Sequence, residues 1–216
     1  MKLRLCLLCL GAAGALCGAA LGQRAPVGAP QDVGWQCPVR EGAVAPQSEA
    51  ERAEQELRQR YRQVLPLFFA VVGEVPDAVL LMPVKGARVS QVSDTWLTLR
   101  GGGRLHEGQD IFAPQGTPVY SATEGYVYRI GNNPRGGQVV TIVGDGGRRY
   151  YYAHLKRFGA IEEGQFVTTD MVIGYVGNTG NARTTPPHLH LGVYEGPLET
   201  CEWNAIDPLP LLADRW

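Results

Sequence analysis

The sequence lacks an apolar run long enough to form a membrane-spanning helix, which needs roughly 20 residues. Its most apolar stretch is a short one near the N-terminus, which follows Lys2 and Arg4 and leads into small residues. This pattern predicts a secretory signal over residues 1–22 that is removed on export. A retained membrane anchor is one alternative. Lipidation at Cys17 is another, although Leu16 stands where a lipoprotein site has a small residue.

An excess of one charge sign is also absent, since the chain has 20 basic and 21 acidic side chains. Proteins that bind nucleic acid usually carry a basic excess, so the composition gives no indication of a nucleic-acid partner. After removal of the signal we expect no stable membrane insertion. The expected location is the periplasm or cell envelope, or the outside of the cell. The sequence indicates no oligomeric state.

Cysteine is scarce, and most of it lies inside the predicted signal. Of the five cysteines, only Cys37 and Cys201 follow residue 22. An even number of cysteines in an oxidising compartment predicts a disulfide between them. The alternative is two free buried thiols, because a bridge needs Cα atoms within about 7 Å and the sequence does not show that distance.

A chain of 216 residues has room for one folded domain with extensions. Residues 23–78 are predicted to form an irregular segment and then a helix over about residues 48–65. Ser48 and Glu51 make a capping box at its start, and apolar residues follow at helical spacing. We expect this amphipathic helix to pack on the domain that follows. A partner-binding helix is the alternative.

Residues 79–216 predict a mainly β domain. Short apolar or alternating runs are separated by turn signals such as Gly136-Gly137, and no helix long enough for parallel crossovers lies between them. We therefore expect antiparallel hairpins. The expected strands cover residues 79–84, 119–130, 138–143, 149–155, 171–176 and 189–194.

All four histidines lie in this β domain. His106 and Asp110 stand four residues apart and flank Gly108, which lets the backbone turn sharply. An imidazole nitrogen and a carboxylate oxygen are both good zinc ligands. The spacing therefore indicates a candidate metal site.

The other histidines fall on predicted strands. On a strand His188 and His190 share one face, with imidazoles about 7 Å apart, while the leucines that alternate with them face the core. One of the pair could bind metal while the other serves a reaction. The same alternation predicts that His154 shares a polar face with Tyr150 and Tyr152.

Taken together, these segments resemble peptidase family M23, the zinc endopeptidases of the lysostaphin and LytM type. The resemblance covers about residues 80–212 and follows the motif order of the family. The matching motifs are RLHEGQDIFAP at 104–114, YAHL at 152–155, GYVGNTGNA at 174–182 and PHLH at 187–190.

The resemblance implies a small antiparallel β-sheet groove with a metal on its floor. Carried over position by position, it implies that Zn²⁺ is bound by His106, Asp110 and His190. It also implies that His154 and His188 are the catalytic histidines, which act as general base and as donor to the oxyanion or the leaving amine. None of these five positions is substituted.

The function implied by the resemblance is hydrolysis of peptide bonds in bacterial cell-wall peptidoglycan, with peptidoglycan peptides as substrate. One alternative is a non-catalytic wall-binding regulator that recruits or activates another hydrolase. A metallopeptidase that acts on proteins is a further option. The complete set of five residues favours an enzyme over the regulator.

Overall fold

The computed structural model describes residue 52, residues 72–196 and residues 204–215. Several predictions lie outside these ranges: the signal, the irregular segment before residue 72, the disulfide between Cys37 and Cys201, and the helix over 48–65 except for Arg52, which is helical. In the described part, no helix is both long enough and apolar enough to cross a membrane.

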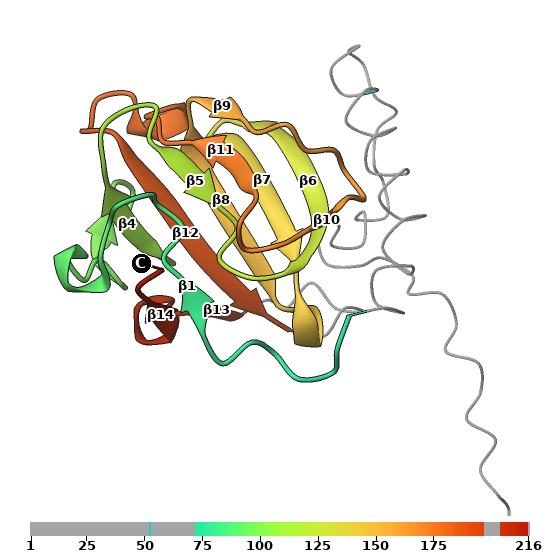
Figure 1. Ribbon diagram of the computed structural model, residues 1–216. Helices are drawn as coiled ribbons and strands as arrows, with labels where there is room; N and C mark the ends of the chain where they lie inside the picture. Colours follow the sequence, from blue (N-terminus) through green and yellow to red (C-terminus); the bar gives the residue numbers. More distant parts are fainter. Residues whose placement is uncertain (1–51, 53–71, 197–203, 216) are drawn as a thin grey trace, which may run out of the picture.

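The largest element is a seven-stranded sheet with the order β10-β6-β7-β8-β12-β13, in which β4 also pairs with β12. All its pairings are antiparallel. Its long strands β6, β7, β8 and β12 form a curved layer (Figure 1). The strands are β4 Gln109–Phe112, β6 Gly125–Asn133, β7 Gly137–Val143, β8 Arg149–Leu155, β10 Phe166–Val167, β12 His188–Glu195 and β13 Asn204–Ile206.

A three-stranded antiparallel sheet, in the order β5-β11-β9, covers one face of the large sheet (Figure 1). Side chains from both sheets build the core, where Val119 and Ile173 of the small sheet lie in one cluster with Tyr152 and Leu191 of the large sheet. Burial of this apolar surface is the main term that stabilises the fold. The three strands are β5 Pro118–Tyr120, β9 Arg157–Phe158 and β11 Val172–Tyr175.

The first and last strands of the described domain are joined to each other. β1 (Leu80–Leu81) pairs in parallel with β14 (Leu212–Ala213). Arg215 donates hydrogen bonds to the carbonyl oxygens of Met82 and Ser121, at 3.0 and 2.6 Å. The C-terminal segment therefore closes one edge of the core.

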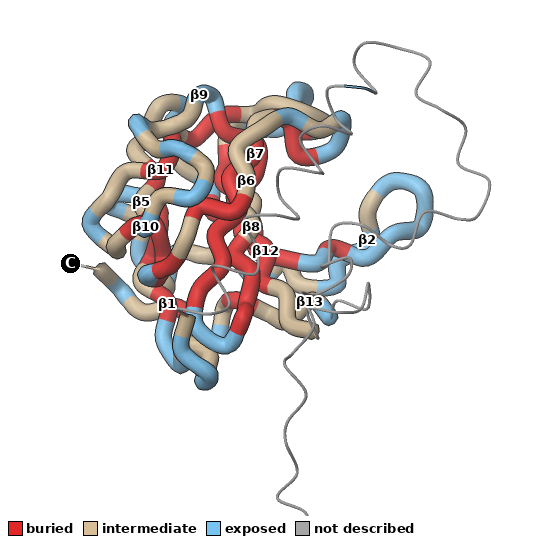
Figure 2. Tube along the Cα trace, turned by 90° about the vertical axis from the view of Figure 1, so that its right-hand side faces the viewer, coloured by how far each residue is buried: buried red, intermediate tan, exposed pale blue. Residues whose placement is uncertain are grey.

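A separate hairpin, β2 (Leu99–Arg100) with β3 (Arg104–Leu105), is closed by a turn of three glycines. Figure 2 shows it, at the label β2, as an exposed arm on the buried body. Apart from Arg52, the helices of the described part are 3₁₀ segments of three residues each. These are η1 Val89–Gln91, η2 Asp145–Gly147, η3 Gly180–Ala182 and η4 Leu209–Leu211.

The prediction of a mainly β domain with antiparallel hairpins is confirmed, and the strand predicted over 149–155 has the bounds of β8. The prediction of one strand over 119–130 is wrong, because a turn at residues 121–124 separates β5 from β6. Ala122 is buried within this turn, so the apolar pattern continues through it. The sequence prediction also omitted β4, whose first two residues are polar.

Candidate metal centre and catalytic groove

Strand β12 presents two histidines on one face, as predicted. Leu189 and Leu191 are fully buried in the core, while His188 and His190 line a groove on the opposite face of the sheet. The period-two alternation of a strand accounts for this division.

Strand β4 brings the carboxylate to the same face. Its register places Asp110 opposite His190 and Phe112 opposite His188, so the side chains of each pair point the same way. Ile111 between them is buried in the core. Two segments 80 residues apart in the chain thus form one polar row.

His106 reaches this row from the loop before β4. Its Nδ1 donates to the carbonyl oxygen of Thr95 at 2.8 Å. A carbonyl can only accept, so Nδ1 carries the proton and Nε2 keeps its lone pair. Gly108 is required in this loop because a Cβ there would lie 2.6 Å from Cε1 of His190 and from the carbonyl oxygen of Leu191.

The ligand atoms of His106, Asp110 and His190 form a compact triangle. His106 Nε2 lies 2.8 Å from His190 Nδ1 and 3.1 Å from Asp110 Oδ1, and His190 Nδ1 lies 3.2 Å from the same oxygen. Tetrahedral zinc, with bonds of about 2.0–2.1 Å, separates its ligand atoms by about 3.3–3.4 Å. Among the described residues this is the one cluster of histidine and acidic groups that could hold a metal ion. Both the donor set and the spacing fit zinc.

The carboxylate of this triangle is held in its charged form. Burial raises the pKa of Asp110, but its contacts with His106 and His190 outweigh burial, and the net pKa lies well below the ordinary value. Arg100 donates to Asp110 Oδ2 at 2.7 Å and balances its charge. Burial lowers the pKa of His190, so its imidazole is neutral, as a metal ligand must be.

His154 lies in the groove, but not in the way that strand alternation predicts. Tyr150 and Tyr152 are fully buried in the core, and Tyr151 lines the groove instead. The predicted shared face is therefore wrong. The cause is the backbone of His154, whose φ of 62° lies in the left-handed region and turns its side chain to the other face of the sheet. This conformation costs about 1–2 kcal/mol for a non-glycine residue.

His154 and His188 stand together next to the triangle. Their ring centroids are 4.9 Å apart, and His188 Nε2 lies 3.7 Å from Asp110 Oδ1. His154 Nδ1 donates to Thr179 O at 2.9 Å and His188 Nδ1 donates to Pro186 O at 2.8 Å. Each bond fixes one tautomer and leaves Nε2 free to accept a proton.

Burial lowers the pKa of His154 to about 4, with a further contribution from the charges of His188 and His190. The imidazole of His154 is therefore neutral at neutral pH. A neutral imidazole can take a proton from a nucleophile.

The groove has a volume of about 1130 Å³ and all five predicted site residues line it. Four further residues that shape it were missed from the sequence: Thr95, Arg100, Arg135 and Tyr151. Arg100 and Arg135 carried no signal because arginine is common on exposed turns. Thr95 acts on His106 through its backbone, which side-chain patterns do not show. Gly101 belongs to the turn between β2 and β3 and also lines the groove.

Residues 104–208 match the model of peptidase family M23. The chain is 43% identical over 126 residues to the L-Ala--D-Glu endopeptidase of Bacillus subtilis (strain 168), which covers 55% of this chain and 38% of the relative. It is 40% identical over 85 residues to the Peptidoglycan DD-endopeptidase ShyA of Vibrio cholerae serotype O1. This match covers 39% of this chain and 19% of the relative. The chain thus spans less than half the length of these curated relatives.

A similar fold is found in the crystal structure of an M23 peptidase from Pseudomonas aeruginosa. The two share 28% sequence identity and a TM-score of 0.51, over 75% of this chain and 61% of that chain. The matched segment, residues 104–208, contains all five of the candidate site residues that meet in the groove. Residues 104–208 of this chain therefore form a segment that matches peptidase family M23.

Proposed function

We propose that this protein is a zinc-dependent endopeptidase that hydrolyses peptide bonds in bacterial cell-wall peptidoglycan. The observation that carries the proposal is the meeting of two sets of groups in one groove. His106, Asp110 and His190 form a triangle of the size that zinc requires. His154 and His188 lie beside it with free Nε2 atoms.

In this proposal His106, Asp110 and His190 hold the metal. When bound, zinc supplies a Lewis acid for the scissile carbonyl and lowers the pKa of water at its open position. Arg100 donates a hydrogen bond to Asp110 Oδ2 and orients the carboxylate. Gly108 leaves room for the ring of His190, because a Cβ at position 108 would lie 2.6 Å from its Cε1.

His154 and His188 perform the proton transfers. One imidazole accepts the proton of the attacking water on its Nε2 and can return that proton to the leaving amine. The other imidazole, once protonated on Nε2, can donate a hydrogen bond to the oxyanion or a proton to the leaving amine. Both side chains are less than a tenth exposed, and both are oriented by backbone carbonyls. Imidazoles that are oriented in this way need no reorganisation during the reaction.

The substrate and location follow from the relatives and the sequence. The relative from Vibrio cholerae is named as a peptidoglycan endopeptidase, and a cell-wall substrate requires export. The predicted signal over residues 1–22 supports export to the periplasm or cell envelope. N-terminal sequencing of the protein secreted by a bacterial host, with a new terminus close to residue 23, is the check on this point.

Release of soluble fragments from dye-labelled purified cell walls tests the proposed function. The zinc-loaded full chain should release dye, a chelator should stop the release, and added zinc should restore it. Mass spectrometry of the fragments then identifies the bond that is cut. Loss of activity in His154→Asn, with zinc content and melting temperature unchanged, would assign chemistry to that histidine.

Two results would contradict the proposal. If the zinc-loaded chain binds cell walls but releases no fragments, it acts as a wall-binding regulator. If it cleaves only unfolded proteins and leaves walls intact, it is a metallopeptidase of another specificity.

A further inference from the structure

The groove is lined by more cationic than anionic side chains. Arg100, Arg104 and Arg135 line it, against Asp110 and Glu107. Asp110 is buried within the candidate metal centre and already paired with Arg100. Among the described residues that line the groove, Glu107 is thus the one exposed carboxylate.

Two of these cations are held directly opposite each other. Arg100 and Arg104 are partners across the β2–β3 hairpin, so their side chains leave the same face. Like charges at such positions destabilise a strand pair. Arg100 is balanced by Asp110, but no described acidic side chain pairs with Arg104, which is exposed. The unpaired charge of Arg104 does not stabilise the hairpin. An anionic ligand bound there would neutralise this charge.

The third cation approaches the reaction centre from another element. Arg135 lies in the turn between β6 and β7 and is exposed. This turn is joined to the catalytic histidines, because the backbone N–H of His154 donates to Gly136 O at 2.7 Å. Asn181 N donates to Arg135 O at 2.9 Å and fixes the turn against η3. Arg104 comes from a different element, since it lies on β3 and precedes the candidate ligand His106 by two residues.

We propose that the groove selects peptides that carry a free carboxylate within a few residues of the scissile bond, and that Arg104 and Arg135 bind this carboxylate. The inference rests on the proposed function and specifies its substrate class. A guanidinium remains charged at every physiological pH and can bind a carboxylate with two parallel hydrogen bonds. A peptide made only of glycine, or one whose carboxylates are amidated, has no such partner to offer.

Binding and cleavage of one matched pair of substrates test the inference. The probes are soluble muropeptides with free carboxylates and the same muropeptides with those carboxylates converted to carboxamides. Calorimetry with the full-length His154→Asn protein measures binding without turnover, and wild-type protein gives kcat/KM. We expect the free-carboxylate form to be favoured about tenfold or more, and the preference to shrink as salt is added.

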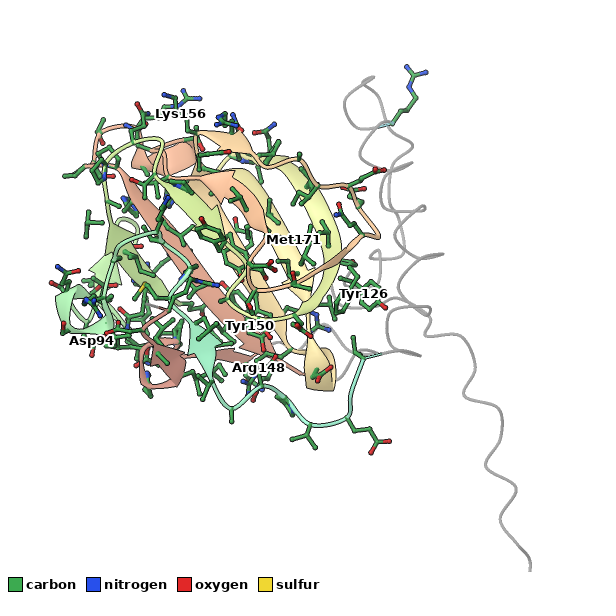
Figure 3. The ribbon with its side chains drawn as sticks, in the orientation of Figure 1. Asp94, Tyr126, Arg148, Tyr150, Lys156 and Met171 are labelled. Atoms are coloured by element: carbon green, nitrogen blue, oxygen red, sulfur yellow. The ribbon has the colours of Figure 1, made fainter. Side chains whose placement is uncertain are left out.

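The double variant Arg104→Gln/Arg135→Gln should reduce the preference to about twofold or less, mainly by weakening binding of the free-carboxylate peptide. The matched control is Lys156→Gln, which removes one exposed positive charge outside the groove lining and at the edge of the molecule (Figure 3). It should keep the wild-type preference.

The outcomes separate this inference from the proposed function. Equal binding of the two peptides would overturn the inference, even if both are cleaved. An equal loss for both peptides in the double variant would also overturn it, because that indicates a structural role for the arginines. Selective binding without any cleavage would uphold the carboxylate site and refute the peptidase.

Discussion

The buried His154 makes the stability of the metal-free protein depend on pH. Its side chain is 8% exposed and its pKa is lowered from 6.5 to about 4, chiefly by burial. The folded protein therefore holds this imidazole neutral, whereas the unfolded chain protonates it near pH 6.5. The stabilising contribution is complete above pH 6.5 and is lost as the pH falls from 6.5 to about 4.

The size of the effect follows from proton linkage. With pKa values of 6.5 unfolded and about 4 folded, the free energy of unfolding should fall by about 2 kcal/mol between pH 7.5 and pH 5 through this residue alone. Below pH 4 the loss levels off at about 3 kcal/mol. Other groups also titrate in this range, so a matched variant must isolate the contribution of His154.

Asparagine is the right replacement because of the backbone. At a φ of 62°, alanine would keep the strain that a left-handed conformation imposes on a Cβ, whereas asparagine adopts this region more readily. Urea unfolding of wild-type and His154→Asn protein, at pH 7.5 and pH 5 in excess chelator, gives the comparison. The stability loss on acidification should be about 2 kcal/mol smaller in the variant. Equal losses in the two proteins would refute a buried neutral His154.

Three further predictions concern the metal centre and the termini. Asp110→Asn should abolish zinc binding and wall hydrolysis together, as seen by metal analysis and dye release, and retained zinc would show that Asp110 is not a ligand. Gly108→Ala should lower zinc affinity about tenfold or more, because the new Cβ would lie 2.6 Å from His190 Cε1, whereas Gly101→Ala, which meets no atom within 4 Å, should not. If Cys37 and Cys201 are bridged, protein exported to an oxidising compartment should show no free thiol on denaturation. Such a disulfide stabilises the fold by up to about 5 kcal/mol. Two titratable thiols would contradict the bridge.

The sequence predicted which histidines line the groove, but it did not predict every backbone feature that places them there. His188 and His190 could be placed on one face because a strand alternates strictly, and β12 obeys that rule. Strand alternation does not hold at His154, because a histidine in the sequence gives no signal of a left-handed backbone conformation. It also failed over 119–130, where the buried Ala122 fills the core from a turn and extends the apolar pattern without extending the strand.

The pairing of strands that lie far apart in the chain was a second feature that the residue pattern could not predict. The pairing of β4 with β12 sets Asp110 beside His190, but the two segments are 80 residues apart and β4 itself has only four residues. Their proximity could be predicted only through the family resemblance. Arg100 shows the same limit, because its bond to Asp110 depends on how a separate hairpin folds back over β4.

The orientation of the histidines depends on the backbone of three loops. His106, His154 and His188 each donate Nδ1 to a carbonyl oxygen, and those carbonyls belong to Thr95, Thr179 and Pro186. Substitution of a side chain removes none of these acceptors directly.

Loop glycines are therefore the positions through which mutation can disturb the histidines. Gly180 follows Thr179 and has a φ of 68°, and a Cβ there would lie 2.3 Å from both the carbonyl oxygen of Arg135 and the backbone nitrogen of Gly137. Any larger residue at position 180 must push apart the loop that orients His154 and the turn that carries Arg135. Proton transfer and carboxylate binding should consequently be lost together through a residue that touches neither the metal nor the substrate.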